Sequence, residues 1–147
     1  MTENPSPMAA RYSETVRRSL SDLVEHGDAA ARLVSRGKEA YDADEMLRFA
    51  AEDLLIRAGE AVHRIDLTRT GFVESHPSLE LRRLKDTRNL VAHGYDIVDS
   101  EILWRILTDH LPRVVSAVRE MLKLPVHEPL ENFRQSAEGI SSPVDEN

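Results

Sequence analysis

The sequence predicts an all-α fold, in which four to five helices form an antiparallel up-and-down bundle. Four long stretches repeat apolar residues at spacings of three and four, which is the period of one helix face. The 147 residues include only three Phe, three Tyr and one Trp, so a core would consist mainly of Leu, Val, Ile and Ala. No β-hairpin signal interrupts these stretches, and their connections are short, which favours antiparallel neighbours.

The composition is that of a soluble globular protein, with 41% hydrophobic and 31% charged residues. The chain has no Cys, which excludes disulfides and thiolate metal sites. No apolar run approaches the roughly 20 residues that a membrane span needs, and the N-terminus lacks the basic start and apolar stretch of a signal peptide. We therefore expect a cytoplasmic protein without a membrane partner.

The charge of the chain limits its partners further. A net charge of −7 argues against a protein that coats nucleic acid non-specifically. Four basic residues nevertheless cluster between positions 82 and 88, namely Arg82, Arg83, Lys85 and Arg88. This cluster is either a local basic patch or an ordinary solvated helix face, and the sequence leaves both open.

Three regions differ in composition. Residues 1–10 contain two Pro and lack apolar periodicity, so we expect a flexible leader. Residues 11–124 carry all the helical patterns and are expected to form one bundle domain. Residues 125–147 place three Pro among polar residues and are expected to be a flexible tail.

The first helix is expected from about residue 12, with Ser13 as its N-cap, to Gly37, a natural stop. Gly27 should interrupt or bend this helix, because glycine costs roughly 1 kcal/mol inside a helix. The apolar stripe consists of Val16, Leu20, Leu23, Val24, Ala30, Ala31 and Val34.

The second helix is expected over residues 42–65, with Asp42 or Asp44 as its cap. Gly59 inside it indicates the close approach of another helix. The neighbouring Glu60 either faces solvent or pairs with a buried Arg, and we expect it to fix the guanidinium of Arg88. The stripe consists of Leu47, Ala50, Leu54, Ala58, Ala61, Val62 and Ile65.

A loop is expected over residues 66–77, and a third helix over 78–92. Leu81, Leu84 and Val91 can share a face of this helix with Arg88. Gly94 suits the left-handed residue that follows a helix end.

The fourth helix should begin at Asp99 or Ser100 and run to residue 123. Pro112 should kink or split it, because proline lacks the backbone N–H of a helix interior. The stripe consists of Ile102, Leu103, Ile106, Leu107, Leu111, Val114, Val115, Val118, Met121 and Leu122.

The chemistry-bearing stretch lies at the end of the third helix, where Arg88, His93 and Tyr95 form the pattern R-x-x-x-x-H-x-Y. An Arg can hold two phosphate oxygens, and a His can move a proton near neutral pH, which suits chemistry on a phosphodiester. The alternative is that Arg88 and His93 only interact with the helix dipole while Tyr95 packs. Five residues separate Arg88 from His93, about 140° round a helix, so both reach one ligand only if the helix ends between them or a second chain supplies one group.

Other catalytic signatures are missing from the sequence. The remaining histidines are scattered without H-x-x-x-H spacing, and there is no Gly-rich phosphate loop and no G-x-S-x-G motif. We therefore expect no metal and no cofactor.

Several stretches together resemble the HepT toxins of the HEPN superfamily. The run from Arg88-Asn89 to His93-Gly94-Tyr95 resembles the R-x-x-x-x-H-x-Y signature of that family. Gly59-Glu60-Ala61 resembles its G-E-A stretch, residues 98–104 resemble the v-D-x-x-x-v-W start of its next helix, and Leu111-Pro112 matches its Leu-Pro. The resemblance covers about residues 13–122, although the Pro-Trp that often precedes the Arg-bearing helix reads Pro77-Ser78 here.

This resemblance implies an all-α homodimer in which the motifs of two subunits share a cleft, and a metal-independent ribonuclease that cannot cut DNA. Arg88 would bind the scissile phosphate, His93 would transfer protons for attack by the ribose 2′-OH, and Asn89 would orient either group.

The resemblance also implies a partner, which is typically a small nucleotidyltransferase antitoxin of a type II- or VII-like toxin–antitoxin pair. In some pairs the antitoxin transfers AMP to the motif tyrosine, here Tyr95, which would bring negative charge into the cleft. The other function that the sequence allows is a non-catalytic helical subunit that docks or regulates such a nucleotidyltransferase.

Overall fold

The computed structural model describes residues 7–92 and 99–123 of the chain. The first six residues of the expected leader and the whole of the expected tail lie outside these ranges. So do His93, Gly94 and Tyr95 of the motif, and the expectations for them are not tested by the fold.

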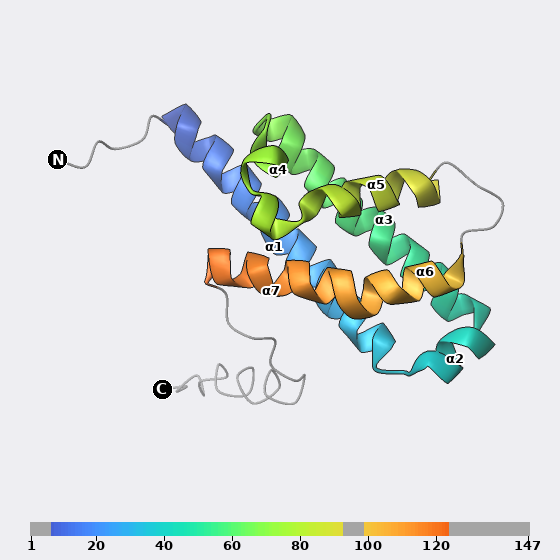
Figure 1. Cartoon of the computed structure of the whole chain (residues 1–147). Coiled ribbons are helices and arrows are strands. Elements are labelled where there is room, and N and C mark those ends of the chain that lie inside the picture. Colours follow the sequence, from blue (N-terminus) through green and yellow to red (C-terminus); the bar gives the residue numbers. More distant parts are fainter. Residues whose placement is uncertain (1–6, 93–98, 124–147) are drawn as a thin grey trace, which may run out of the picture.

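The described residues form an all-α bundle, as the sequence predicts, and contain no β-strand. The two longest helices, α1 (Pro7–Val34) and α3 (Glu45–Thr68), run antiparallel and side by side (Figure 1). The helix α5 (Leu81–Ala92) packs on α3, and the last helical segment lies across α1. The expected up-and-down bundle is therefore confirmed, and α3 lies at its centre because it packs against both α1 and α5.

The helix α1 differs from expectation at its start and in its middle. It begins at Pro7, inside the stretch expected as leader, because proline is well suited to a first helical turn and the following Met8, Ala9 and Ala10 are strong helix formers. It also continues through Gly27 without interruption. A Cβ atom on Gly27 would overlap the side chain of Val115, so this glycine is a point of close approach to the last helix.

A short helix, α2 (Lys38–Ala43), was not expected and lies between α1 and α3. It follows Gly37, whose φ of 90° ends α1 as predicted. Of the two candidate caps, Asp44 is the cap of α3, because its side chain accepts a hydrogen bond from the backbone N–H of Met46 at 2.9 Å. The six residues of α2 are too few for a helical period to show in the sequence.

The expected loop over residues 66–77 is mostly helical. The helix α3 continues to Thr68, and α4 (Phe72–Ser75) and the 3-10 turn η1 (Pro77–Leu79) follow. Both short elements bury apolar side chains, among them Phe72 and Leu79. The third expected helix consequently begins at Leu81, after Glu80 in a left-handed conformation with φ of 52°.

The fourth expected helix is one run that consists of α6 (Ser100–Arg105), a π-helical turn η2 (Ile106–His110) and α7 (Leu111–Leu122). Asp99 caps it by accepting a hydrogen bond from the backbone N–H of Glu101. The backbone N–H of Leu111 bonds to the carbonyl of Ile106, five residues back. This wider turn comes just before Pro112 and accommodates the proline ring, so that the chain neither breaks nor splits there.

The core is aliphatic, as the composition predicts, but three helix stripes differ from the expected ones. On α1, Ala31 is exposed, whereas Leu33 is buried. Ile102 and Met121 are each 45% exposed, although both were assigned to the stripe of the fourth helix. On α3, which corresponds to the expected second helix, Ala50 is exposed, whereas Ala51 and Leu55 are buried. No helix in the described ranges is long and apolar enough to cross a membrane.

Candidate functional site

The candidate site is built around Arg88 on α5. Leu81 and Leu84 on the same helix are 1% and 0% exposed, which fixes the buried face of α5. Arg88 lies next to this face and is half-buried. The predicted shared face is therefore confirmed, and the stem of Arg88 is packed against the bundle.

Gly59 on α3 receives the Arg88 side chain. A Cβ atom on Gly59 would overlap the Cβ of Arg88, and it would also lie 2.8 Å from the backbone carbonyl oxygen of Leu84. Only glycine allows α3 and α5 to approach this closely. The close helix approach predicted at Gly59 is confirmed, and it occurs at the candidate catalytic Arg.

The Nε atom of Arg88 is shielded from solvent and has no hydrogen-bond partner in the part of the chain that the structure describes. A buried charged N–H without an acceptor is costly. Carboxylate and phosphate oxygens are the acceptors that a guanidinium binds most strongly. The chemistry at this position therefore favours an anionic ligand.

Glu60 is half-buried and adjoins Gly59 on α3. No hydrogen bond or ion pair joins Glu60 to Arg88 within the described residues. Glu60 instead contributes to the raised pKa of Arg57, which results first from the hydrogen bond to Asp53. A role for Glu60 at Arg88 stays a prediction.

Asn89 is exposed and lies one position beyond Arg88, about 100° further round α5. His93 and Tyr95 belong to residues 93–98, between the end of α5 and the start of α6. The structure describes the chain on both sides of this segment, and each side contacts another helix of the bundle. The first flank is fixed by the contact between Gly59 and Arg88.

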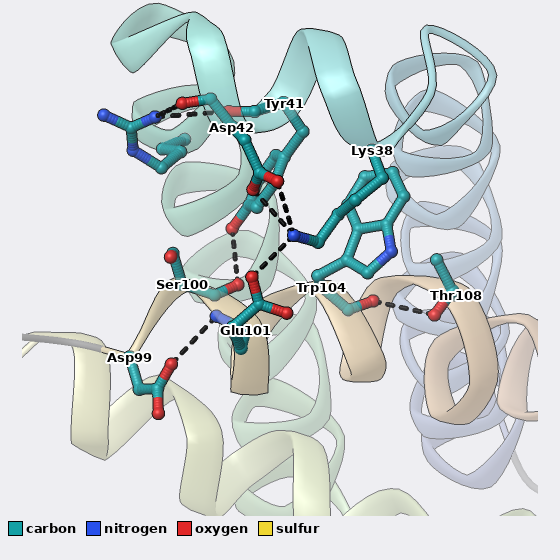
Figure 2. Close-up of polar contacts among 9 residues, drawn as sticks. Lys38, Tyr41, Asp42, Asp99, Ser100, Glu101, Trp104 and Thr108 are labelled. Atoms are coloured by element: carbon teal, nitrogen blue, oxygen red, sulfur yellow. Dashed lines mark hydrogen bonds and ion pairs between the residues drawn. The ribbon is translucent and has the colours of Figure 1, made fainter.

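The second flank is attached to α2 (Figure 2). The Tyr41 hydroxyl donates a hydrogen bond to the carbonyl oxygen of Ser100 at 2.9 Å. The Lys38 ammonium contacts the carboxylates of Asp42 at 2.7 Å and Glu101 at 2.5 Å. The start of α6, directly after the motif segment, is thus attached to an element that also packs on α3.

The charges and burial of this attachment shift two pKa values. Hydrogen bonds to Asp42 and Glu101 raise the pKa of Lys38 above its ordinary value. Burial raises the pKa of Tyr41, whose ring also contacts Trp104 with centroids 4.8 Å apart. The sequence analysis missed Lys38 and Tyr41 because it missed α2.

The four residues of the basic cluster differ in their contacts and in their exposure to solvent. Lys85 forms an ion pair with Asp66 of α3 at 3.0 Å. Arg82 and Arg83 are exposed. The cluster is therefore partly a structural contact between helices and partly a solvent-facing pair of guanidinium groups.

The sequence pattern did not indicate that His110 is buried. His110 is 1% exposed, and neither ring nitrogen has a hydrogen-bond partner in the described chain. Burial is the main cause of its lowered pKa. In the same ranges no group of three His, Asp or Glu side chains is arranged to hold a metal ion.

The comparisons with known proteins agree with the resemblance drawn from the motif. Neither the comparison with curated proteins nor that with solved structures found a match. A family model described as ribonuclease HepT-like matches residues 19–121, which include Gly59, Glu60, Arg88 and the whole motif. This match spans most of the bundle, and the chain therefore belongs to the ribonuclease HepT-like family of the HEPN superfamily.

Proposed function

We propose that this protein is an endoribonuclease and the toxin subunit of a toxin–antitoxin pair in the cytoplasm. The observation that carries this proposal is the family match over residues 19–121, within which Arg88 occupies the close contact between α3 and α5. The stem of Arg88 packs against α3, and its Nε has no hydrogen-bond partner among the described residues, which supports an anionic ligand for this guanidinium. The phosphodiester of RNA provides such a ligand.

In the proposed reaction, His93 removes the proton from the ribose 2′-OH, and the 2′-oxygen attacks the adjacent phosphorus. The bond from phosphorus to the 5′-oxygen breaks, and the leaving oxygen takes a proton, which gives a 2′,3′-cyclic phosphate and a 5′-OH. Arg88 binds the phosphate oxygens and stabilises the charge that develops on them. Asn89 orients the phosphate or the imidazole. DNA lacks the 2′-OH and is not a substrate.

The proposed assembly is a homodimer that brings two motifs into one cleft. Arg88 and His93 are five residues apart, and a straight helix would point them about 140° away from each other. A two-fold axis near the end of α5 would let the two subunits complete each site.

The test is RNA cleavage by the purified wild-type protein in the presence of EDTA, with end-group analysis of the products. Arg88→Ala and His93→Ala should each lose about 100-fold or more of the activity, the usual scale for a charge-stabilising or acid–base group. Circular dichroism should show that both variants remain folded. Equal activity in the wild type and in both variants would refute this site and indicate a contaminating nuclease.

Glu60 is proposed as the supporting carboxylate of the site. It lies beside the glycine that contacts Arg88, and it is half-buried without being fully withdrawn from solvent. In this role its charge would hold the Arg88 guanidinium in the orientation that binds phosphate. Glu60→Gln keeps the shape of the side chain, removes the charge and should raise KM for RNA more than it lowers kcat.

Control by a small nucleotidyltransferase antitoxin completes the proposal. The phenol of Tyr95 ionises near pH 10 when unperturbed, so it is a poor proton-transfer group at pH 7 and a suitable acceptor for AMP. Each added phosphodiester would place negative charge near Arg88 and compete with RNA. Intact-mass spectrometry after incubation with the partner, ATP and Mg²⁺ should show added AMP, and Tyr95→Phe should prevent it. Inhibition without a mass change would favour a blocking complex instead.

A second candidate function is a non-catalytic subunit that docks a partner nucleotidyltransferase. It is favoured by two large apolar side chains near the start of α3, because Met46 is 69% and Phe49 is 52% exposed. Residues three apart lie on the same face of a helix, and contiguous exposed apolar surface marks protein contacts. Partner binding that is lost in a Met46→Ser, Phe49→Ser double variant, together with no RNA cleavage by the wild type, would select this function.

A further inference from the structure

The helix that carries Arg88 has a charge opposite to that of the whole chain. Residues 81–92 contain four basic side chains and one acidic side chain, whereas the chain has a net charge of −7. Such a local excess concentrates positive potential along one helix. Which of these cations face a ligand depends on their position round α5.

Two of the four cations are already in contact with the bundle. The stem of Arg88 packs against Gly59, and Lys85 pairs with Asp66, with side chains 33% and 16% exposed. The other two, Arg82 and Arg83, are exposed, and their guanidinium groups form no ion pair or hydrogen bond in the described part of the chain.

Helix geometry places Arg82 and Arg83 on different sides of α5. Arg82 precedes Asn89 by seven residues, which is two turns, about 20° of rotation and roughly 10 Å along the axis. Arg83 is turned by about 100° from Arg82. The structure gives independent evidence for the second direction, because the charge of Arg83 contributes to lowering the pKa of the buried His110. Arg82 therefore shares the side of Asn89, and Arg83 lies toward the last helical run.

We propose that Arg82 binds a second phosphate of the RNA strand whose scissile phosphate lies at Arg88 and Asn89. The inference rests on the proposed function and adds a subsite to it. An unpaired guanidinium can bind a phosphate through two parallel hydrogen bonds, which a solvated ammonium cannot do. The side of α5 that carries Arg82 and Asn89 would then follow the RNA backbone, and the enzyme would prefer a strand of several nucleotides to a dinucleotide.

The test compares Arg82→Gln with Arg83→Gln, since the two residues are adjacent, exposed and equal in charge. Each variant is assayed on an oligoribonucleotide and on a dinucleoside monophosphate, which carries only the scissile phosphate. Arg82→Gln should raise KM for the oligonucleotide about 5-fold, the scale of one exposed charge contact, and leave kcat unchanged. It should leave cleavage of the dinucleotide as in the wild type. Arg83→Gln should change neither substrate.

The dependence on salt gives a second measure. Loss of one phosphate contact should reduce the slope of log affinity against log salt concentration by about 0.7 for single-stranded RNA. Arg82→Gln should show this reduction and Arg83→Gln should not. Arg82→Lys should recover the slope because it restores the charge.

Three outcomes are decisive. If Arg82→Gln and Arg83→Gln have equal effects, these residues attract RNA only through their overall charge, and the proposed subsite is wrong. An equal effect of Arg82→Gln on both substrates would place Arg82 at the scissile phosphate or in the fold, and also overturns it. If the wild type and Arg88→Ala are equally inactive, the proposed function fails. Fluorescence anisotropy with the labelled oligonucleotide then still decides the subsite, which requires weaker binding in Arg82→Gln alone.

Discussion

Gly59 of α3 and Arg88 of α5 are in direct contact, and a methyl group on Gly59 would overlap the Cβ atom of Arg88. The same methyl group would lie 3.2 Å from the Arg88 Cγ atom and 2.8 Å from the carbonyl oxygen of Leu84. The packing of α3 on α5 and the position of the candidate catalytic Arg therefore depend on the absence of a side chain at residue 59.

Gly59→Ala should consequently damage both stability and catalysis. Alanine forms helices better than glycine by about 1 kcal/mol, but the overlap here involves backbone as well as side-chain atoms and forces α5 outward. Overpacking of this kind costs about 1–3 kcal/mol, and a displacement of about 1 Å at a catalytic group can reduce the rate about 100-fold. Urea unfolding and RNA cleavage, measured where the variant is fully folded, test the two effects. A fully active Gly59→Ala protein would show that the contact does not position Arg88.

Gly27→Ala is the matched comparison, because it introduces the same methyl group at another helix contact. The overlap at Gly27 is with the side chain of Val115 only, whose Cβ would be 3.3 Å away. We expect a loss of stability without a loss of cleavage by the folded protein. Val115→Ala should restore stability in the Gly27→Ala background while destabilising the wild type, which a double-mutant cycle detects as coupling. Purely additive losses would argue against the contact.

The sequence predicted a close helix approach at Gly59, and only the expected pairing of the neighbouring Glu60 with Arg88 indicated which helix it is. A glycine inside a helical pattern implies that another helix approaches, whereas the identity of that helix depends on the tertiary arrangement. Gly27 carried the same signal and was misread as a break. In both cases packing between helices outweighs the intrinsic cost of glycine in a helix.

The elements that the sequence missed are short. The helices α2 and α4 have six and four residues, so neither spans enough turns to repeat an apolar face. Pro112 was read correctly as a perturbation, but the π turn that absorbs it depends on backbone geometry rather than on side-chain pattern. The motif at Arg88 was singled out from its residue types together with the family resemblance, and its role stays a prediction, while the attachment through Tyr41 required the fold.

Tyr41→Phe should weaken the attachment of α6 to α2. The substitution removes the hydrogen bond from a ring that is 0% exposed and leaves the carbonyl oxygen of Ser100 without this donor. A lost hydrogen bond of this type costs about 1 kcal/mol. Lys38→Ala removes ion pairs that are open to water and should cost less. Urea midpoints of the two variants test this order. A larger loss of stability in Lys38→Ala would show that the exposed ion pairs stabilise the protein more than the hydrogen bond of the buried Tyr41.

His110 should make the stability of the protein depend on pH. Its ring is 1% exposed and unpaired within the described residues, and its pKa is lowered from 6.5 by burial first and then by Arg83. Arg113 lowers the pKa as well, and Glu80 and Asp109 oppose these effects. The net result is that the folded protein holds His110 neutral at a pH where the unfolded chain is already protonated.

The sign of the pH effect follows from proton binding. Below about pH 6.5 the unfolded chain binds more protons at His110 than the folded protein, so the free energy of unfolding decreases as the pH falls, by at most about 1.4 kcal/mol per pH unit. His110→Leu removes the titration and also removes two buried nitrogens that have no partner among the described residues. Urea unfolding at pH 8 and pH 5 should therefore show a smaller loss of stability in His110→Leu than in the wild type. Equal losses in the wild type and His110→Leu would mean that other groups set the pH dependence.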